Sequence, residues 1–321
     1  MQHFLLSAKA RTLSLKAVFR MGEDKAYQTF CQLRWPETEG EAVCPRCGCV
    51  ESYNIVTRRK FKCVACHHQF SVTSGTIFAS RKLSYTDLLA AIVLFVNGAK
   101  GVSALQMSRD LDVQYKTAFV LAHKLREAMA HEDKGQVLNG EVELDGAYFG
   151  GYVKPANEKE NRRDRRLAIN QSGKRQVVVV GRERDGDMLT VVAKSEAKGG
   201  EIISARIHHM ATVHADEASH WDELHARFDT RRINHTVSYS DGYACTNQAE
   251  SFFSRLRRME IGTHHHIAGP YLAAYAGEAA WREDNRRIDN GCQAMMVAEA
   301  GLASGVSRKW KGYWQRGGDR S

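Results

Sequence analysis

The chain has 321 residues, 43% of them hydrophobic, so it is long enough for two or three packed domains and is expected to be globular. Lysine and arginine number 46 against 37 acidic residues, and the net charge of +9 favours a polyanionic partner such as nucleic acid. No apolar run approaches the roughly 18–20 residues that cross a bilayer, and the basic N-terminus lacks the apolar stretch of a secretory signal. We therefore expect a cytoplasmic protein with no membrane contact.

The N-terminal part begins with a predicted helical segment, residues 1–43, which ends near Trp35 and Pro36. The next segment, residues 44–78, has paired cysteines and β-favouring residues in place of the helical pattern. Helical periodicity then returns over residues 79–131, and a polar stretch ending in Asn139 and Gly140 predicts a domain linker. Three helices are expected between 79 and 131: Tyr85–Asn97, Ser103–Leu111 and Gln114–Met129.

Two Cys-x-x-Cys units in residues 44–78 are separated by fifteen residues. Two thiolates at that spacing bind one ion from a turn, and two such turns complete a tetrahedron around Zn²⁺. A redox pair is the alternative, but two matched units flanked by aromatic residues favour a structural zinc ribbon. The predicted ligands are Cys44, Cys47, Cys63 and Cys66. Three neighbours that could compete as ligands are interpreted as bystanders: Cys49, His67 and His68.

The last two of the helices expected in residues 79–131 have the outline of a helix-turn-helix, with Asp112 and Val113 in the turn. The second helix would present Lys116 and Thr117 near its N-terminal end, where a recognition helix meets base edges. An ordinary helical packing unit with solvated charges is the alternative.

Strands and helices alternate in the second half, over residues 140–290, which predicts an α/β domain. A basic loop over 152–175, with eight lysines and arginines against three acids, interrupts the pattern, and residues 291–321 are expected to be a basic C-terminal tail. The predicted strands are Glu141–Tyr148, Gln176–Arg182, Met188–Lys194, Thr212–Asp216 and the short Thr236–Tyr239. The predicted helices are Gly200–His209, His220–Arg227 and Asn247–Met259.

Three acids in this half stand where elements could bring them together. Asp145 lies on an alternating strand, Asp216 ends a second strand, and Glu250 lies in the first turns of a helix. Crowded carboxylates repel one another, and divalent cations remove that cost. Mg²⁺ prefers oxygen ligands, and two such ions about 4 Å apart support phosphoryl displacement. The set therefore predicts a two-metal site for Mg²⁺, with Mn²⁺ as a possible substitute.

At this point the sequence resembles insertion-sequence transposases with an Asp-Asp-Glu triad, in particular the family of insertion sequence 1595. The resemblance runs from about Thr29 to Arg287. It is carried by the cysteine segment, by Glu143–Gly151 and, most specifically, by Thr246–Arg258. Members of that family have an N-terminal zinc ribbon and an RNase H-like catalytic domain. The resemblance thus implies a mixed five-stranded sheet flanked by helices, preceded by the ribbon and the helix-turn-helix.

Carried over residue by residue, the resemblance makes Asp145 the first catalytic acid, Asp216 the second and Glu250 the third. Some relatives use Asn at the third position, which leaves Asn247, one helical turn before Glu250, as an alternative. We favour Glu250 because a carboxylate neutralises and bridges metal ions better than an amide does. Arg257 lies two turns after Glu250, where such transposases often keep a basic residue facing DNA.

The implied activity is binding of the terminal inverted repeats of an insertion element, cleavage at its ends, and strand transfer into target DNA. The partner is double-stranded DNA, held by a homodimer or larger assembly, because two ends must be handled together. The protein would work in the cytoplasm, at the nucleoid. The residues expected to contact the DNA backbone are Arg162, Arg163, Arg165, Arg166, Arg257 and Arg258.

Three alternatives remain at this level. One is a zinc-ribbon DNA-binding regulator without catalysis. The second is an RNase H-like nuclease or resolvase that cuts DNA without joining it. The third is a degenerate, inactive transposase copy, which the intact set of three acids disfavours.

Overall fold

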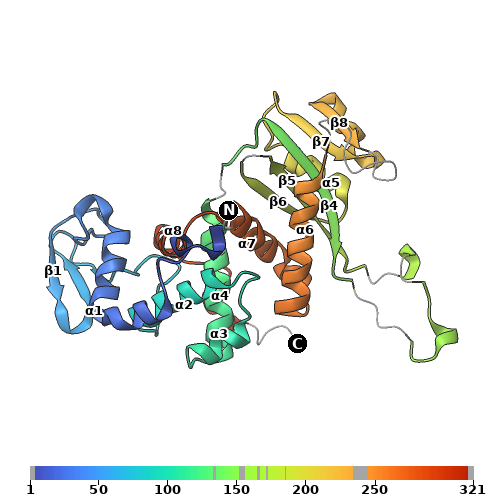
Figure 1. Ribbon diagram of the computed structural model, residues 1–321. Helices are drawn as coiled ribbons and strands as arrows, with labels where there is room; N and C mark the ends of the chain where they lie inside the picture. Colours follow the sequence, from blue (N-terminus) through green and yellow to red (C-terminus); the bar gives the residue numbers. More distant parts are fainter. Residues whose placement is uncertain are drawn as a thin grey trace. The chain divides into compact units, whose positions relative to one another are not determined.

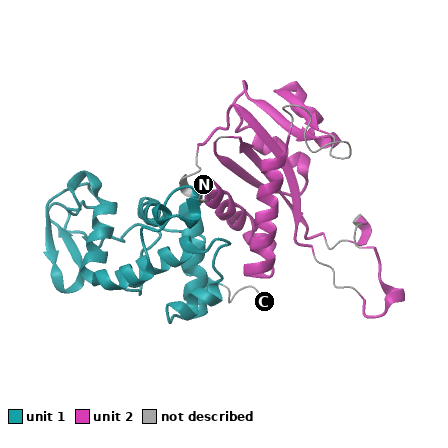
Figure 2. Ribbon diagram, viewed as in Figure 1, with its two compact units in different colours: residues 1–132, 285–321 teal, residues 133–284 magenta. Residues whose placement is uncertain are grey.

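The computed structural model describes residues 4–132, 135–151, 156–164, 167–170, 173–184, 186–233 and 245–316. The chain forms two compact units (Figure 2): residues 1–132 together with 285–321 make the first, and residues 133–284 make the second. Within the described ranges, none of the helices has the length and apolar character needed to cross a bilayer.

The helices of the first unit begin where side chains cap their free N–H groups. The backbone N–H of Ala17 donates to the Ser14 hydroxyl at the start of α1 (Leu15–Arg34), which bends at Gly22, where φ is 75°. Ser84 caps α2 (Tyr85–Asn97) in the same way. Asp289 caps α8 (Asn290–Ala303), which packs against α1, α2 and α4 (Tyr115–Glu132).

The cysteine segment forms a small antiparallel sheet of β1 (Ser52–Ile55), β2 (Lys60–Cys63) and β3 (Gln69–Phe70). Its core is aromatic. The ring centroids of Phe61 and Phe70 lie 5.6 Å apart, and Trp35, at the end of α1, lies edge-on to both rings. A core this small gives little apolar burial, so the fold of this segment depends on what the cysteines bind.

The predicted helix-turn-helix segment forms two helices, α3 (Ala104–Asp110) and α4, which pack against each other. The Ser103 hydroxyl accepts from the N–H of Gln106 at the start of α3. Asp112 adopts a left-handed conformation in the turn, with φ of 49°. The core side of α4 is apolar, because Ala118, Leu121, Ala122 and Leu125 are buried.

The second unit is built on a mixed five-stranded sheet of order β6-β5-β4-β7-β8 (Figure 1). The first three strands along the chain, β4 (Glu141–Phe149), β5 (Gln176–Glu183) and β6 (Met188–Ala193), are antiparallel neighbours. The last two, β7 (Thr212–Asp216) and β8 (Asp229–Ile233), are parallel to β4. The predicted α/β class with five strands in a mixed sheet is confirmed.

Helices cover both faces of this sheet, because β4 and β5 are apolar on both sides. One face, with Val142 and Leu144, packs against α5 (Glu196–Ser204). The other face, with Ala147 and Phe149, packs against α6 (Asn247–Met259) and α7 (Leu272–Asp284). The acids Glu143 and Asp145 alternate with Val142 and Leu144, so they lie on the α6 side.

Several elements differ from the expectations. The α5 helix begins earlier than predicted, at Glu196 and not Gly200, because the Ser195 hydroxyl caps it. The predicted helix at His220–Arg227 is a 3-10 helix, Ser219–Ala226. The fifth strand is β8, and the predicted strand at Thr236–Tyr239 lies outside the described residues. The segment expected to be a basic tail begins with most of α8.

The remaining short elements are helical turns. One π-helical turn, Glu260–His264, continues α6. The other 3-10 helices are Phe4–Leu6, Ala8–Ala10, Pro36–Thr38, Val56–Arg58, Lys159–Asn161, Ala168–Asn170 and Gly269–Tyr271.

Candidate active site and metal centre

The four predicted zinc ligands lie together in the first unit. Their sulfur atoms are all within 4.8 Å of one another. The Sγ atoms of Cys44 and Cys66 are 3.6 Å apart, and those of Cys47 and Cys63 are 3.5 Å apart. A tetrahedral ion with Zn–S bonds of about 2.3 Å has sulfur atoms about 3.8 Å apart. The cysteine quartet therefore has the geometry of a structural zinc site.

The backbone around the quartet favours thiolates. The N–H of Cys66 points at the Cys63 sulfur, 3.4 Å away, and this contact lowers the pKa of Cys63 to about 6. A thiolate rather than a thiol is the metal ligand. The neighbours interpreted as bystanders stay outside the quartet, and the Cys49 thiol instead points to the carbonyl oxygen of Glu51. Four protein ligands leave no open position, so this centre is structural.

In the second unit, the first two predicted acids lie on neighbouring parallel strands. The pairing of β4 with β7 sets Glu141 beside Thr212 and Glu143 beside His214. The pairing ends there; continued for two more residues, the same register would bring Asp145 level with Asp216. Neighbouring strands are about 4.8 Å apart, and side chains at the same level point to the same face. This register favours a position of the two carboxylates side by side on the α6 face.

The loop after Asp216 is held by hydrogen bonds. The Asp216 carboxylate accepts from the N–H of Ala218 at 3.0 Å. Arg232 on β8 donates to the carbonyl oxygens of Asp216 and Ala218, at 2.5 and 2.7 Å. These contacts keep the end of β7 in place at the edge where Asp216 lies.

The third predicted acid, Glu250, lies on the first turn of α6, and a buried carboxylate on β4 anchors that turn. Glu143 is fully buried, and its Oε2 accepts from the N–H groups of Gln248 and Ala249, at 2.8 and 3.2 Å. A carboxylate at a helix N-terminus satisfies free N–H groups and interacts favourably with the helix dipole. Its other oxygen, Oε1, accepts from Arg184 Nε at 3.3 Å. One strand therefore carries both Asp145 and the group that fixes α6.

Sequence reasoning did not single out Glu143 as a functional position. In the sequence, Glu143 is one of three acids that alternate with apolar residues on a strand, which predicts only that it lies on the polar face. Only its position two residues before Asp145 could have indicated that both belong to one site.

The pKa of Asp145 is shifted by burial and by neighbouring acids. Burial raises the pKa of Asp145, and the charges of Asp216, Glu250 and Glu196 raise it further, to about 7, although the N–H of Gly146 opposes the rise. Among the residues that the structure describes, only the cysteine quartet brings three or more ligand atoms within 4.8 Å. The acids are thus neighbours at a wider spacing, close enough to repel one another.

Glu196 is a fourth acid that the sequence did not reveal. It is the first residue of α5, and it fits against β4 because Gly146 has no side chain: a Cβ there would lie 2.7 Å from Glu196 Cγ. Burial and the charge of Asp216 raise the pKa of Glu196, and its partner His220, 3.3 Å away, opposes this. The contact between Gly146 and Glu196 exists only in the folded sheet.

The alternative third residue, Asn247, is the first residue of α6 and is exposed. Glu250 is half-buried, and the Thr246 hydroxyl lies 3.5 Å from its Oε1. The charge of Glu250 acts on Asp145, which places it in the group of interacting acids. Nothing comparable ties Asn247 to Asp145.

The predicted DNA-contacting residues that are described are all exposed. Lys116 and Thr117 lie on the first turn of α4, and Arg257 lies over the ring of Phe149, 5.2 Å from its centroid. Arg258 donates to the Ser254 hydroxyl. Arg162 and Arg163 follow the 3-10 turn between β4 and β5, where Arg162 donates to the carbonyl oxygens of Ala156 and Asn157. Arg165 and Arg166 lie outside the described residues.

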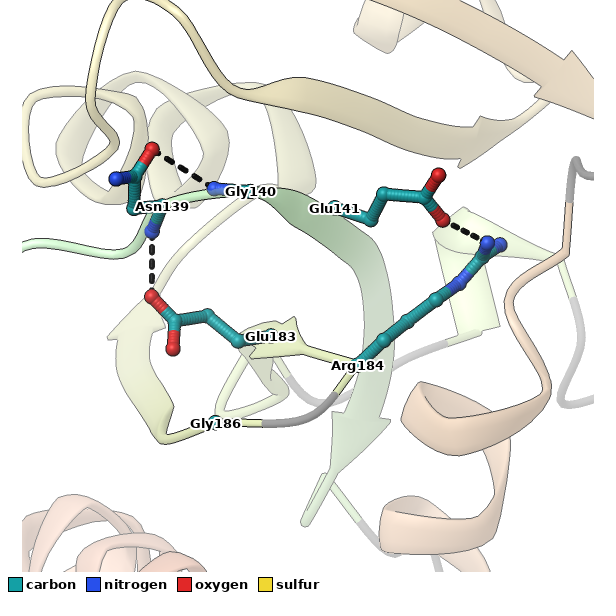
Figure 3. Close-up of a pocket in the computed structure, with 6 residues that line it drawn as sticks. All are labelled: Asn139, Gly140, Glu141, Glu183, Arg184 and Gly186. Carbon is teal, nitrogen blue, oxygen red and sulfur yellow. Dashed lines mark hydrogen bonds and ion pairs between the residues drawn. The ribbon is translucent and has the colours of Figure 1, made fainter.

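A shallow pocket lies at the start of β4 (Figure 3), lined by Asn139, Gly140, Glu141, Glu183, Arg184 and Gly186. Glu141 and Arg184 form an ion pair across it, and the N–H of Asn139 donates to Glu183. Asp145 is four residues further along β4, about 13 Å away at 3.3 Å per residue. The pocket is therefore separate from the group of acids.

The donor set of this group fits hard divalent cations. It offers carboxylate oxygens, which Mg²⁺ and Mn²⁺ prefer, and no thiolate. Burial raises the pKa of Asp145 most, and a bound cation would neutralise the neighbouring negative charges that raise this pKa further.

Comparison with known protein families matches two segments of the chain. Residues 137–284, which include all four acids, match the ISXO2-like transposase domain. Residues 21–69, which include the cysteine quartet, match the transposase zinc-ribbon domain. A search of curated proteins found no match. The two matches together cover more than half of the chain and bear out the resemblance seen in the sequence. The chain belongs to the transposase family of insertion sequence 1595.

Proposed function

We propose that this protein binds the terminal inverted repeats of an insertion element, cuts the DNA at its ends and joins the freed ends to target DNA. The proposal is supported most by the register of β4 and β7, which, extended by two residues, would bring Asp145 level with Asp216, and by the charge of Glu250, which raises the pKa of Asp145. These acids lie within the segment that matches a transposase domain.

In this proposal Asp145, Asp216 and Glu250 hold two Mg²⁺ ions. When bound, these ions supply Lewis acidity, which favours deprotonation of the attacking hydroxyl and stabilises the leaving oxygen. In cleavage, water forms a P–O bond and the 3′ oxygen of the element's end leaves. In transfer, that 3′-hydroxyl forms a P–O bond with a target phosphate, and the target's own 3′ oxygen leaves with a proton. No protein nucleophile is required.

The protein's other residues bind and orient the DNA. Glu143 keeps α6, and with it Glu250, at a fixed distance from β4. Arg257 is exposed two turns beyond Glu250 and would contact the DNA backbone. The α3–α4 pair would bind the inverted repeats, with Lys116 and Thr117 toward the bases. Two ends must be joined in one event, so we expect a homodimer or larger assembly working at the nucleoid.

A strand-transfer assay tests this proposal. Labelled oligonucleotides carrying the element's ends are incubated with supercoiled plasmid and Mg²⁺. The wild type should give joined products, and Asp145→Ala, Asp216→Ala and Glu250→Ala should each lose them by about 10³-fold or more. Asn247→Ala should keep most of the activity.

Other outcomes would replace the proposal. Nicked DNA without joined products would indicate a nuclease or resolvase. DNA binding that all three alanine variants retain, with no cleavage by the wild type, would indicate a regulator or an inactive copy. Loss of activity in Asn247→Ala but not in Glu250→Ala would make the amide the third ligand.

A further inference from the structure

The C-terminal part of the first unit carries a compact basic loop, which we call the C-terminal segment, Ser307–Arg316. It contains four basic residues and no acid. Trp310 in its middle is buried, with 4% of its surface exposed, whereas the charged side chains on either side of Trp310 are exposed. The basic residues are Arg308, Lys309, Lys311 and Arg316. The segment thus turns an aromatic residue inward and its positive charges to solvent.

The aromatic side of the segment is fastened to α4. The Trp310 ring stacks on His123, with centroids 4.2 Å apart and an interplanar angle of 16°. The Ser307 hydroxyl donates to the Glu127 carboxylate at 2.7 Å, and the indole N–H of Trp314 donates to the carbonyl oxygen of Lys116 at 3.2 Å. Lys116, His123 and Glu127 lie on one face of α4, over about 17 Å of helix.

The segment is closed on itself. The Arg316 guanidinium donates to the carbonyl oxygens of Arg308 and Lys309, at 3.2 and 2.6 Å, and its Nε lies 3.4 Å from that of Gly312. These bonds return the end of the segment to its beginning. The charges of Arg308 and Lys309 are therefore presented from a folded loop, with less conformational entropy to lose on binding than a free tail has.

The segment also borders the end of α4 that is proposed to enter DNA. The ammonium group of Lys116 lies 5.4 Å from the centroid of the Trp314 ring, within reach of a cation–π interaction. Gln114 and Thr117, beside it, are exposed. Through Trp314, the segment thus lies next to Lys116 at the N-terminal end of α4.

We propose that the C-terminal segment is a second DNA-contacting element, which binds backbone phosphates beside the groove that the N-terminal end of α4 enters. This rests on the proposed function and adds a surface to it. Duplex DNA is the occupant that the chemistry favours, because the segment carries four exposed basic residues and no acidic residue of its own, and the buried indole already packs on α4. An acidic protein surface would be the competing occupant.

The test uses the full chain and two double variants that remove the same charge. Lys309→Gln with Lys311→Gln neutralises the segment, and Lys9→Gln with Lys25→Gln neutralises two exposed lysines elsewhere in the first unit. The Kd for a 30-base-pair duplex carrying the element's end is measured by fluorescence anisotropy at several salt concentrations. The segment variant should bind about tenfold or more weakly at 0.1 M salt, and its slope of log Kd against log salt should fall by about 2.

The control pair should change Kd by less than about twofold, and Lys309→Arg with Lys311→Arg should restore binding. Equal weakening by both pairs would overturn the proposal, since net charge alone would then explain the effect. Unchanged DNA binding in the segment variant would also overturn it and would leave an acidic protein as the occupant. Unfolding curves recorded alongside ensure that the variants compared are folded.

The outcome is separable from that of the catalytic proposal. If the segment variant loses DNA binding and the wild type fails to join strands, only the catalytic proposal is wrong. If the wild type joins strands and the segment variant binds DNA as well as the wild type does, only the segment proposal is wrong.

Discussion

The molecule has two places where side chains suited to metal ions gather, and they are built differently. The cysteine quartet comes from two tight turns, and its sulfur atoms are already within 4.8 Å of one another. The acids come from two strands and a helix, and among the described residues no three of their ligand atoms lie that close. A single zinc ion would neutralise the thiolates that surround it in the quartet, whereas carboxylates without a bound cation repel one another. The cysteine quartet can therefore be assembled locally, but the group of acids needs a rigid scaffold.

The largest effect is expected from a substitution in the cysteine quartet. Cys63→Ser should remove bound zinc and unfold the ribbon, because metal binding supplies on the order of 10 kcal/mol to such small domains. Zinc content by atomic absorption and proteolysis of residues 21–69 measure this. Cys49→Ser, whose thiol is outside the quartet, should keep its zinc. If Cys63→Ser retained zinc and a folded ribbon, the two centres would not differ as described.

The next effect concerns charge at the acid site. Without metal, Asp145→Asn should stabilise the protein at pH 8, by at most about 2–4 kcal/mol, and do little near pH 4. Unfolded Asp145 loses its proton near 3.8, but the folded protein keeps it until about 7, so the wild type loses stability as pH rises between these values.

Urea unfolding in EDTA over this pH range measures the difference. Added Mg²⁺ should stabilise the wild type more than Asp145→Asn at pH 8, because the cation neutralises the carboxylates. A pH-independent difference between the two proteins would contradict the assignment of the raised pKa.

A smaller effect is expected from the scaffold itself. In Glu143→Gln an amide N–H₂ would replace the oxygen facing the Arg184 donor, and the charge at the start of α6 would be lost. We expect a cost of about 1–3 kcal/mol in urea unfolding. A weaker affinity for Mn²⁺, measured by electron paramagnetic resonance, should accompany it. Glu141→Gln, which also loses an ion pair to Arg184 but is 40% exposed, should cost under about 1 kcal/mol.

The smallest effect should come from Glu196→Gln. Removing the fourth negative charge should lower the pKa of Asp145 slightly. It should also raise the Mg²⁺ concentration needed for half-saturation of the site by about two- to threefold. Glu201→Gln on the same helix removes an exposed acid that pairs with Lys198, and it should change nothing measurable. An effect of equal size from both variants would mean that general surface charge, not proximity to Asp145, is responsible.

Much of the fold and of the site was predictable because local signals were strong. The helices Tyr85–Asn97 and Asn247–Met259 begin and end as predicted, since capping or apolar periodicity marks them. The cysteine spacing predicted the quartet. Strand β8 was missed because Asp229–Ile233 is an edge strand rich in charged residues, which has no hydrophobic alternation. The roles of Glu143 and Glu196 depend on contacts between elements far apart in the chain, which no local pattern records.

The first unit is made from two separate parts of the chain, and this affects the order in which the two units fold during synthesis. Helix α8 packs against α1, α2 and α4, yet more than 150 residues separate it from α4 along the chain. A ribosome releases the segments in sequence, so the first unit waits for its last helix while the second unit is already folding. In a nascent chain, the second unit with its group of acids would thus fold before α8 packs against the helices proposed to hold DNA. The helices proposed to hold DNA would be fully packed only after α8 has been synthesised.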